Sequence, residues 1–127
     1  MLTVRIGTTR LVVIACGIAV KFARSTCGID CNRREDARWT KYRNHPTRGK
    51  HLCPVLWCHS NGSVLIMPEA TPFPIGRRAN EEVDALYADG WWESSHDRIP
   101  DPTESKSEDW GFLDGRIVVV DYGHPDR

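Results

Sequence analysis

The stretch Trp110-Gly111-Phe112-Leu113-Asp114-Gly115-Arg116-Ile117-Val118-Val119-Val120-Asp121-Tyr122-Gly123 predicts a β-hairpin. A short apolar run leads into Asp114-Gly115, and a β-branched run leads out of it. Asp-Gly accepts the positive φ angles of a two-residue hairpin turn. Asp121 directly follows the apolar strand and precedes Tyr122-Gly123. A carboxylate in this position either presents a metal or phosphate ligand at the sheet edge or simply ends the strand in a polar turn.

Length and composition indicate one globular domain with a single core. The 127 residues are 40% hydrophobic and 27% charged, with a net charge of zero. The charge is unevenly distributed: residues 1–50 carry a net +8, and residues 51–127 carry a net −8. Either the two halves pack through complementary surfaces, or one charged face steers a partner of opposite sign.

The order of the predicted elements indicates an α+β fold. Strands are expected at residues 2–7 and 11–22, a hairpin at 52–67, a short acidic helix at 81–89 and an irregular polar loop at 93–109. Gly17 interrupts the second run, which predicts two short strands or one bent strand. We therefore expect an antiparallel sheet that carries one main helix.

The main helix is predicted over residues 32–44. Asp30 or Asn32 can serve as its N-cap, and Glu35 and Asp36 then lie in its first turn. Its basic residues are expected either to form a solvated face or to bind phosphate. They are Arg33, Arg34, Arg38, Lys41 and Arg43.

The adjacent pair Trp91-Trp92 is predicted to lie in the core or in a lid. Large aromatic side chains contribute most where they are fully desolvated. Contact with a partner protein is the alternative role for Trp91 and Trp92.

Four short motifs occur in the order in which protein kinases carry them. They are Ala19-Val20-Lys21, Glu35, Met67-Pro68-Glu69-Ala70 and Asp121-Tyr122-Gly123. The chain therefore resembles a truncated member of the protein-kinase-like family, similar to small kinase-like proteins of bacteriophages. The resemblance implies that Lys21 neutralises phosphate, Glu35 holds Lys21, and Asp121 binds magnesium. Within one domain, residues 1–70 would correspond to the small lobe and residues 71–127 to a vestigial large lobe.

The departures from the kinase pattern concern catalysis. Only Gly7 stands where the family has a glycine-rich phosphate loop. Asp109 occupies the place of the metal-binding asparagine, and Glu104, Asp97 and Asp101 are rival candidates for the catalytic base. The chain ends soon after Gly123, so the resemblance implies that the activation segment is missing. We therefore expect a pseudokinase, and we assign none of these residues as its catalytic base.

The cysteines offer a competing interpretation. Cys27 with Cys31, and Cys53 with Cys58 and His59, could ligate one zinc ion. The spacings are looser than those of ordinary zinc ribbons, so we expect separate thiols and no zinc. No secretion signal or membrane span is recognisable, so we expect reduced thiols and a location in the cytosol of a host cell.

Three functions follow from these patterns. The first is a non-catalytic, kinase-like binding protein of a phage or mobile element, which needs no cofactor and inhibits a host macromolecule such as a CRISPR-type defence complex. Its partner would be a protein that meets a charged face containing Arg33, Arg34, Arg38, Lys41 and Glu104. The second is a minimal phosphotransferase that binds ATP and magnesium through Lys21, Glu35 and Asp121. The third is a nucleic-acid-binding module that uses the basic half of the chain.

Overall fold

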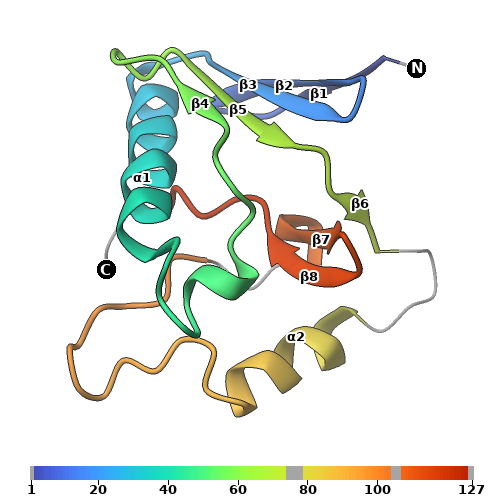
Figure 1. Ribbon diagram of the computed structural model, residues 1–127. Helices are drawn as coiled ribbons and strands as arrows, with labels where there is room; N and C mark the ends of the chain where they lie inside the picture. Colours follow the sequence, from blue (N-terminus) through green and yellow to red (C-terminus); the bar gives the residue numbers. More distant parts are fainter. Residues whose placement is uncertain (1, 74–78, 104–106, 126–127) are drawn as a thin grey trace.

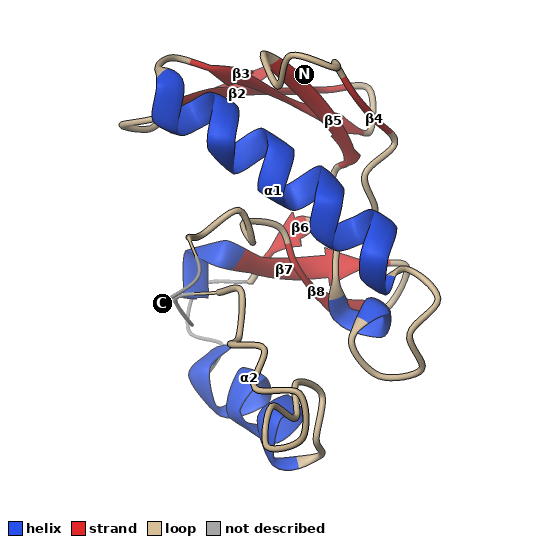
Figure 2. Cartoon of the chain, turned by 90° about the vertical axis from the view of Figure 1, so that its left-hand side faces the viewer, coloured by secondary structure: helices blue, strands red, loops and turns tan. Residues whose placement is uncertain are grey.

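The computed structural model describes residues 2–73, 79–103 and 107–125 (Figure 1). A five-stranded sheet lies at one end, helix α1 (Thr26–Tyr42) packs beneath it, and a small three-stranded sheet and helix α2 (Ala79–Ala88) follow (Figures 1 and 2). The predicted α+β fold, with an antiparallel sheet and one main helix, is confirmed.

The larger sheet has the strand order β1-β2-β3-β5-β4, and all its neighbours are antiparallel. Its strands are β1 (Thr3–Ile6), β2 (Arg10–Ala15), β3 (Ile18–Ala23), β4 (Trp57–Cys58) and β5 (Val64–Pro68). The predicted interruption at Gly17 is the turn between β2 and β3, so the run forms two short strands. Side chains alternate between the two faces, and Lys21 and Leu65 are paired on the inner one.

Helix α1 begins earlier than the sequence pattern predicted. Its N-cap is Ser25, whose side chain accepts a hydrogen bond from the backbone N–H of Gly28. The predicted caps Asp30 and Asn32 are therefore wrong, because Ser25 already satisfies the start of the helix. Glu35 lies in the middle of α1 and is buried, rather than lying in the first turn as predicted.

The smaller sheet contains β6 (Thr71–Pro72), β7 (Trp110–Leu113) and β8 (Arg116–Val119). The predicted terminal hairpin is present, and its turn residues Asp114 and Gly115 have φ angles of 51° and 80°. The prediction of a hairpin over 52–67 is only partly correct. Only β4 pairs with β5, whereas Leu52, after the 3-10 helix η1 (Gly49–His51), forms a parallel bridge with Val119 of β8.

Tryptophans fill the core below α1. Trp91 packs edge-on against Trp110 with ring centroids 5.2 Å apart, and Trp92 packs against Tyr42 at 4.9 Å. Trp91 and Trp92 are buried, which agrees with the core role and does not fit the alternative of a partner surface. They follow α2, and a second 3-10 helix, η2 (Ser107–Asp109), leads into β7. Neither helix of the described ranges has the length and apolar character needed to cross a membrane.

Gly28 sets the distance between α1 and the turn that joins β1 to β2. A Cβ atom at this position would lie 2.1 Å from the carbonyl oxygen of Thr9 and 3.1 Å from the Cα of Ala23. Both contacts are with backbone atoms, which cannot rotate away. The close approach therefore requires glycine within the first turn of α1.

We predict that Gly28→Ala destabilises the protein by about 2 kcal/mol, because overpacking against backbone costs more than the gain in helix propensity. The control is Thr40→Ala, at an exposed position of α1, which should be neutral or slightly stabilising. Urea unfolding monitored by circular dichroism measures both changes. Equal stability of Gly28→Ala and the wild type would contradict this packing.

Candidate functional site

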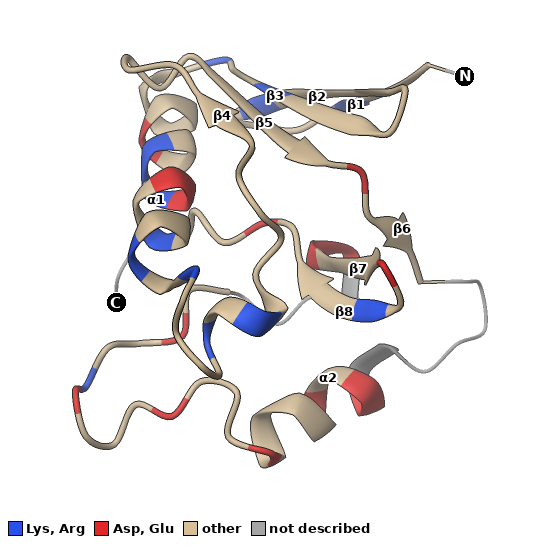
Figure 3. Ribbon diagram, in the orientation of Figure 1, with Lys and Arg blue, Asp and Glu red and all other residues tan. Residues whose placement is uncertain are grey.

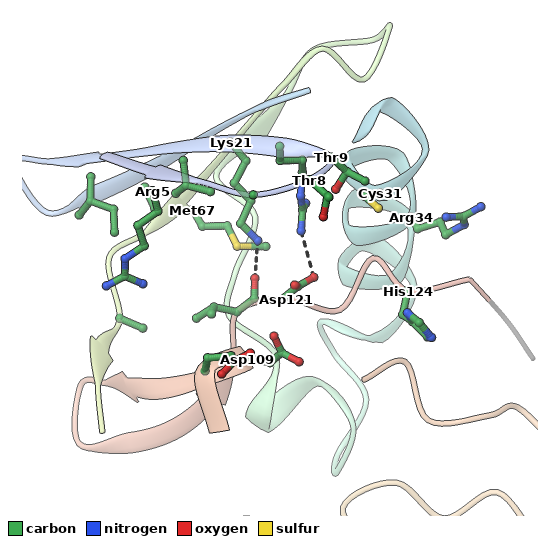
Figure 4. A pocket seen from close by; sticks show the side chains of 18 of the residues that line it. Arg5, Thr8, Thr9, Lys21, Cys31, Arg34, Met67, Asp109, Asp121 and His124 are labelled. Atoms are coloured by element: carbon green, nitrogen blue, oxygen red, sulfur yellow. Dashed lines mark hydrogen bonds and ion pairs between the residues drawn. The ribbon is translucent and has the colours of Figure 1, made fainter. Parts of the chain in front are cut away.

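A cleft of about 800 Å³ lies between the inner face of the larger sheet, α1 and the segment that follows β8 (Figure 4). Its sheet side carries Lys21 of β3 and the β1–β2 turn, and its opposite side carries Asp109 and Asp121. The predicted hinge-like segment, residues 67–70, lines the same cleft. The structure thus brings Lys21, Asp121 and Asp109 to one site, although Lys21 lies in the larger sheet and Asp121 in the segment that follows β8 of the smaller sheet.

Glu35 lies behind this cleft and is completely buried. Its carboxylate accepts two hydrogen bonds from the Arg10 guanidinium, at 2.7 and 3.0 Å, and one from Lys21 Nζ at 2.9 Å. The backbone N–H groups of Tyr122 and Gly123 also donate to Oε2, each at 3.0 Å. Five donors from three segments therefore surround one carboxylate.

These neighbours keep Glu35 ionised. Burial alone would raise the pKa of the carboxyl, but the charges of Lys21 and Arg10 outweigh it and hold the pKa at about 2. A buried carboxylate is stable only when its charge and its lone pairs are matched in this way.

Arg10 is the central residue that the sequence analysis missed. It is buried at the start of β2, and besides Glu35 its guanidinium donates to Asn32 Oδ1 at 3.1 Å and to Asp121 Oδ1 at 3.0 Å. Burial alone would lower its pKa, but Glu35 and Asp121 raise it above the ordinary value. The sequence feature that could have pointed to Arg10 is its position as a single arginine directly before the apolar run Leu11–Ala15.

Asn32 is a second residue of the site, although its place in the sequence predicted a helix N-cap. Its side-chain amide donates to the carbonyl oxygens of Lys21, at 3.2 Å, and Gly62, at 2.9 Å. It therefore joins α1 to β3 and to the turn before β5, while its own oxygen accepts from Arg10.

The magnesium ion that the kinase resemblance implies does not fit this arrangement. The Asp121 carboxylate is half-exposed toward the cleft, but it already pairs with the Arg10 guanidinium at 3.0 Å (Figure 4). Among the described residues, no three His, Cys, Asp or Glu side chains are grouped closely enough to hold a metal. Arg10 supplies positive charge at the carboxylate where a metal ion would supply it.

The candidate catalytic bases lie elsewhere. Asp97 accepts two hydrogen bonds from the Arg48 guanidinium, at 2.7 and 3.1 Å, and Asp101 accepts one from the Tyr87 hydroxyl. Neither of these aspartates lines the cleft, so their assignment as catalytic bases is not supported by their positions. Glu104 lies outside the described residues.

The cysteines do not converge on one site. Cys27 and Cys31 line the cleft from α1, whereas Cys53 is buried and Cys58 belongs to β4. Burial raises the pKa of Cys53 to about 11, which favours a neutral thiol. In the described ranges the zinc alternative therefore lacks a ligand cluster.

Two arginines of the predicted partner surface bind the protein's own terminal segment. Arg38 donates to the Tyr122 carbonyl oxygen at 2.5 Å, and Arg34 donates to that of Gly123 at 3.4 Å. The prediction that both face a partner stays a prediction; both side chains are half-buried, and each makes this contact with residues 122–123. Arg33 and Lys41 are exposed, so α1 does display basic charge (Figure 3).

Comparisons with known proteins leave the family open. No protein-family model matches the chain, and no curated protein is significantly similar to it. The kinase resemblance therefore rests on the sequence motifs.

We predict that Glu35→Gln lowers the free energy of unfolding by about 3 kcal/mol at pH 7. Because the folded-state pKa lies below the ordinary value of 4.5, the stabilisation is complete above that value and is lost as the pH falls toward 2. The difference between the variant and the wild type should therefore shrink from pH 6 to pH 3.

Urea titrations at several pH values measure this difference. Glu69→Gln, which changes an exposed carboxylate on the hinge-like segment, is the matched control and should have little effect. A Glu35→Gln variant that keeps the acid sensitivity of the wild type would contradict the assignment.

Proposed function

We propose that the chain is a non-catalytic, kinase-like binding protein that acts by contacting another macromolecule. The observation that carries the proposal is the position of Arg10, whose guanidinium bridges Glu35 and Asp121 inside the cleft. A phosphotransferase of the kinase type needs the corresponding aspartate for magnesium. Here an internal cation neutralises that aspartate.

Other groups of the cleft are also engaged within the chain. Lys21 Nζ binds Glu35 and donates to the Val120 carbonyl oxygen. The backbone N–H of Glu69, in the hinge-like segment, donates to the Gly17 carbonyl oxygen at 2.9 Å. These contacts support a role of the cleft residues in holding the fold together, and the Lys21–Glu35 pair taken alone fits both candidate functions.

The resemblance to phage-borne kinase-like proteins suggests the class of partner. We propose a host macromolecule, such as a defence complex, whose action the bound protein inhibits or modulates. Exposed basic residues of α1, including Arg33 and Lys41, remain candidates for a charged contact.

A second candidate function is a nucleotide-binding phosphotransferase. It is favoured by the volume of the cleft, about 800 Å³, and by the presence of Lys21 and Asp121 on its walls. Pockets that hold small-molecule ligands have this size. Such an activity would require Arg10 to leave Asp121.

We predict no magnesium-dependent thermal stabilisation by ATP and no phosphoryl transfer to the chain itself or to generic protein substrates. The physical reason is that the Arg10 cation already neutralises the aspartate that would bind the metal. Differential scanning fluorimetry with ATP, with and without magnesium, and transfer of radiolabelled phosphate are the measurements.

Asp121→Ala is the matched control for any ATP-dependent stabilisation or phosphoryl transfer that the wild type shows. A phosphoryl-transfer signal in the wild type that this substitution abolishes would support the second candidate function and contradict the first.

A further inference from the structure

The outer face of the larger sheet is apolar across all five strands. Paired residues of neighbouring strands share a face, so one row crosses the sheet. This row is Val4, Val13, Val20, Ile66 and Trp57. Lys21 points into the cleft on the inner face, so its neighbour Val20 and the rest of the row point outward.

The next row is also apolar. Ile6 pairs with Leu11, Leu11 with Phe22, and Phe22 with Val64. The charged side chains of these strands, Arg5, Arg10 and Lys21, all line the cleft on the inner face. The charges of these strands therefore all lie on the inner face, beside aliphatic residues such as Val12, Ile14 and Leu65, whereas the two outer rows carry only apolar side chains.

No described element covers this outer face. Helix α1 packs on the inner side, and the remaining elements lie beyond it (Figures 1 and 2). Ile6 is 70% exposed, Val4 51%, Trp57 50% and Phe22 39%. Even Val13 and Val20, on the central strands, are only half-buried.

The exposed apolar area lies at the upper end of what a monomer displays and approaches the area of a protein interface. Leu2, Val4, Ile6, Ile18, Phe22 and Trp57 together expose on the order of 600 Å², taking about 200 Å² for each side chain. The half-buried central residues add to this area. The largest apolar patch on a typical monomer is about 300–600 Å², and a stable interface buries about 800 Å² on each partner.

We propose that this face binds a second copy of the same chain, forming a symmetric dimer in which the two sheets pack face to face. Twisted sheets pack in this way across apolar faces about 10 Å apart. A two-fold axis would place each row against the same face of the other copy, which requires no complementary charge. The net charge of the chain is zero, so two copies have no net repulsion.

The full chain should therefore sediment as a dimer at micromolar concentration and dissociate on dilution. Analytical ultracentrifugation over a concentration series of the wild type provides the measurement. We expect Phe22→Lys and Val4→Lys each to weaken self-association at least about 100-fold, because each substitution enters a symmetric interface twice. Thr40→Lys, at an exposed position of α1, is the matched control and should leave the dimer unchanged.

Salt provides a second readout that needs no variant. Because the proposed contact contains no ion pairs, raising the salt concentration should not weaken the dimer. Circular dichroism checks the folding of each variant, and Val4→Lys, on the edge strand β1, decides the outcome if Phe22→Lys does not fold.

A wild type that remains a monomer across the concentration series would overturn the proposal. The proposal would also be overturned if that monomer bound a different protein through this face. A dimer that neither lysine substitution weakens would also overturn it. These outcomes are independent of the cleft, so they leave the test of the proposed function unchanged.

Discussion

The buried carboxylate of Glu35 is the interaction on which the rest of the structure depends. It joins Arg10 of β2, Lys21 of β3 and the backbone of residues 122–123 to helix α1. Residues 122–123 lie more than 80 positions from Glu35 in the sequence, so this carboxylate fixes the end of the chain to the helix and the larger sheet. An ionised group in the interior is tolerated only with full pairing, so the loss of any one partner leaves the others with an uncompensated charge.

The same network gives the cleft its chemical character. Positive charge from Arg10 reaches Asp121 at 3.0 Å, and Lys21 binds both Glu35 and the carbonyl oxygen of Val120. An internal guanidinium can neutralise a carboxylate as a metal ion does, but it does not coordinate that carboxylate and the phosphate oxygens together, as magnesium does in a kinase. Under the proposed function, a kinase-like arrangement is retained for stability, and the surface of the protein carries the binding.

Local signals in the sequence were sufficient for most elements. The Asp114-Gly115 turn, the interruption at Gly17 and the acidic helix before Gly90 all depend on neighbouring residues, and the structure contains them. The partnership of Leu52 with Val119 could not be predicted, because a parallel bridge between distant segments leaves no local pattern. Similarly, the start of α1 depends on Ser25 as the N-cap, but Asp30 and Asn32 are equally suitable cap residues, so the local sequence did not distinguish among the three.

The site was predictable in part. Lys21, Glu35 and Asp121 followed from the order of the motifs, whereas Arg10 is a single charge whose role depends on which face of β2 it occupies. The apolar outer face was likewise present in the sequence of β1, β2 and β3, where the only charged residues, Arg5, Arg10 and Lys21, share the other face. It becomes informative only when the structure shows that α1 covers the opposite face.

The most direct test of this account is a titration of the wild-type protein with Mn²⁺, followed by electron paramagnetic resonance. Because Arg10 occupies the position beside Asp121, the account predicts no stoichiometric Mn²⁺ binding that depends on Asp121. One bound Mn²⁺ per chain that is lost in Asp121→Asn would contradict it, because the metal ion would then occupy the place assigned to Arg10.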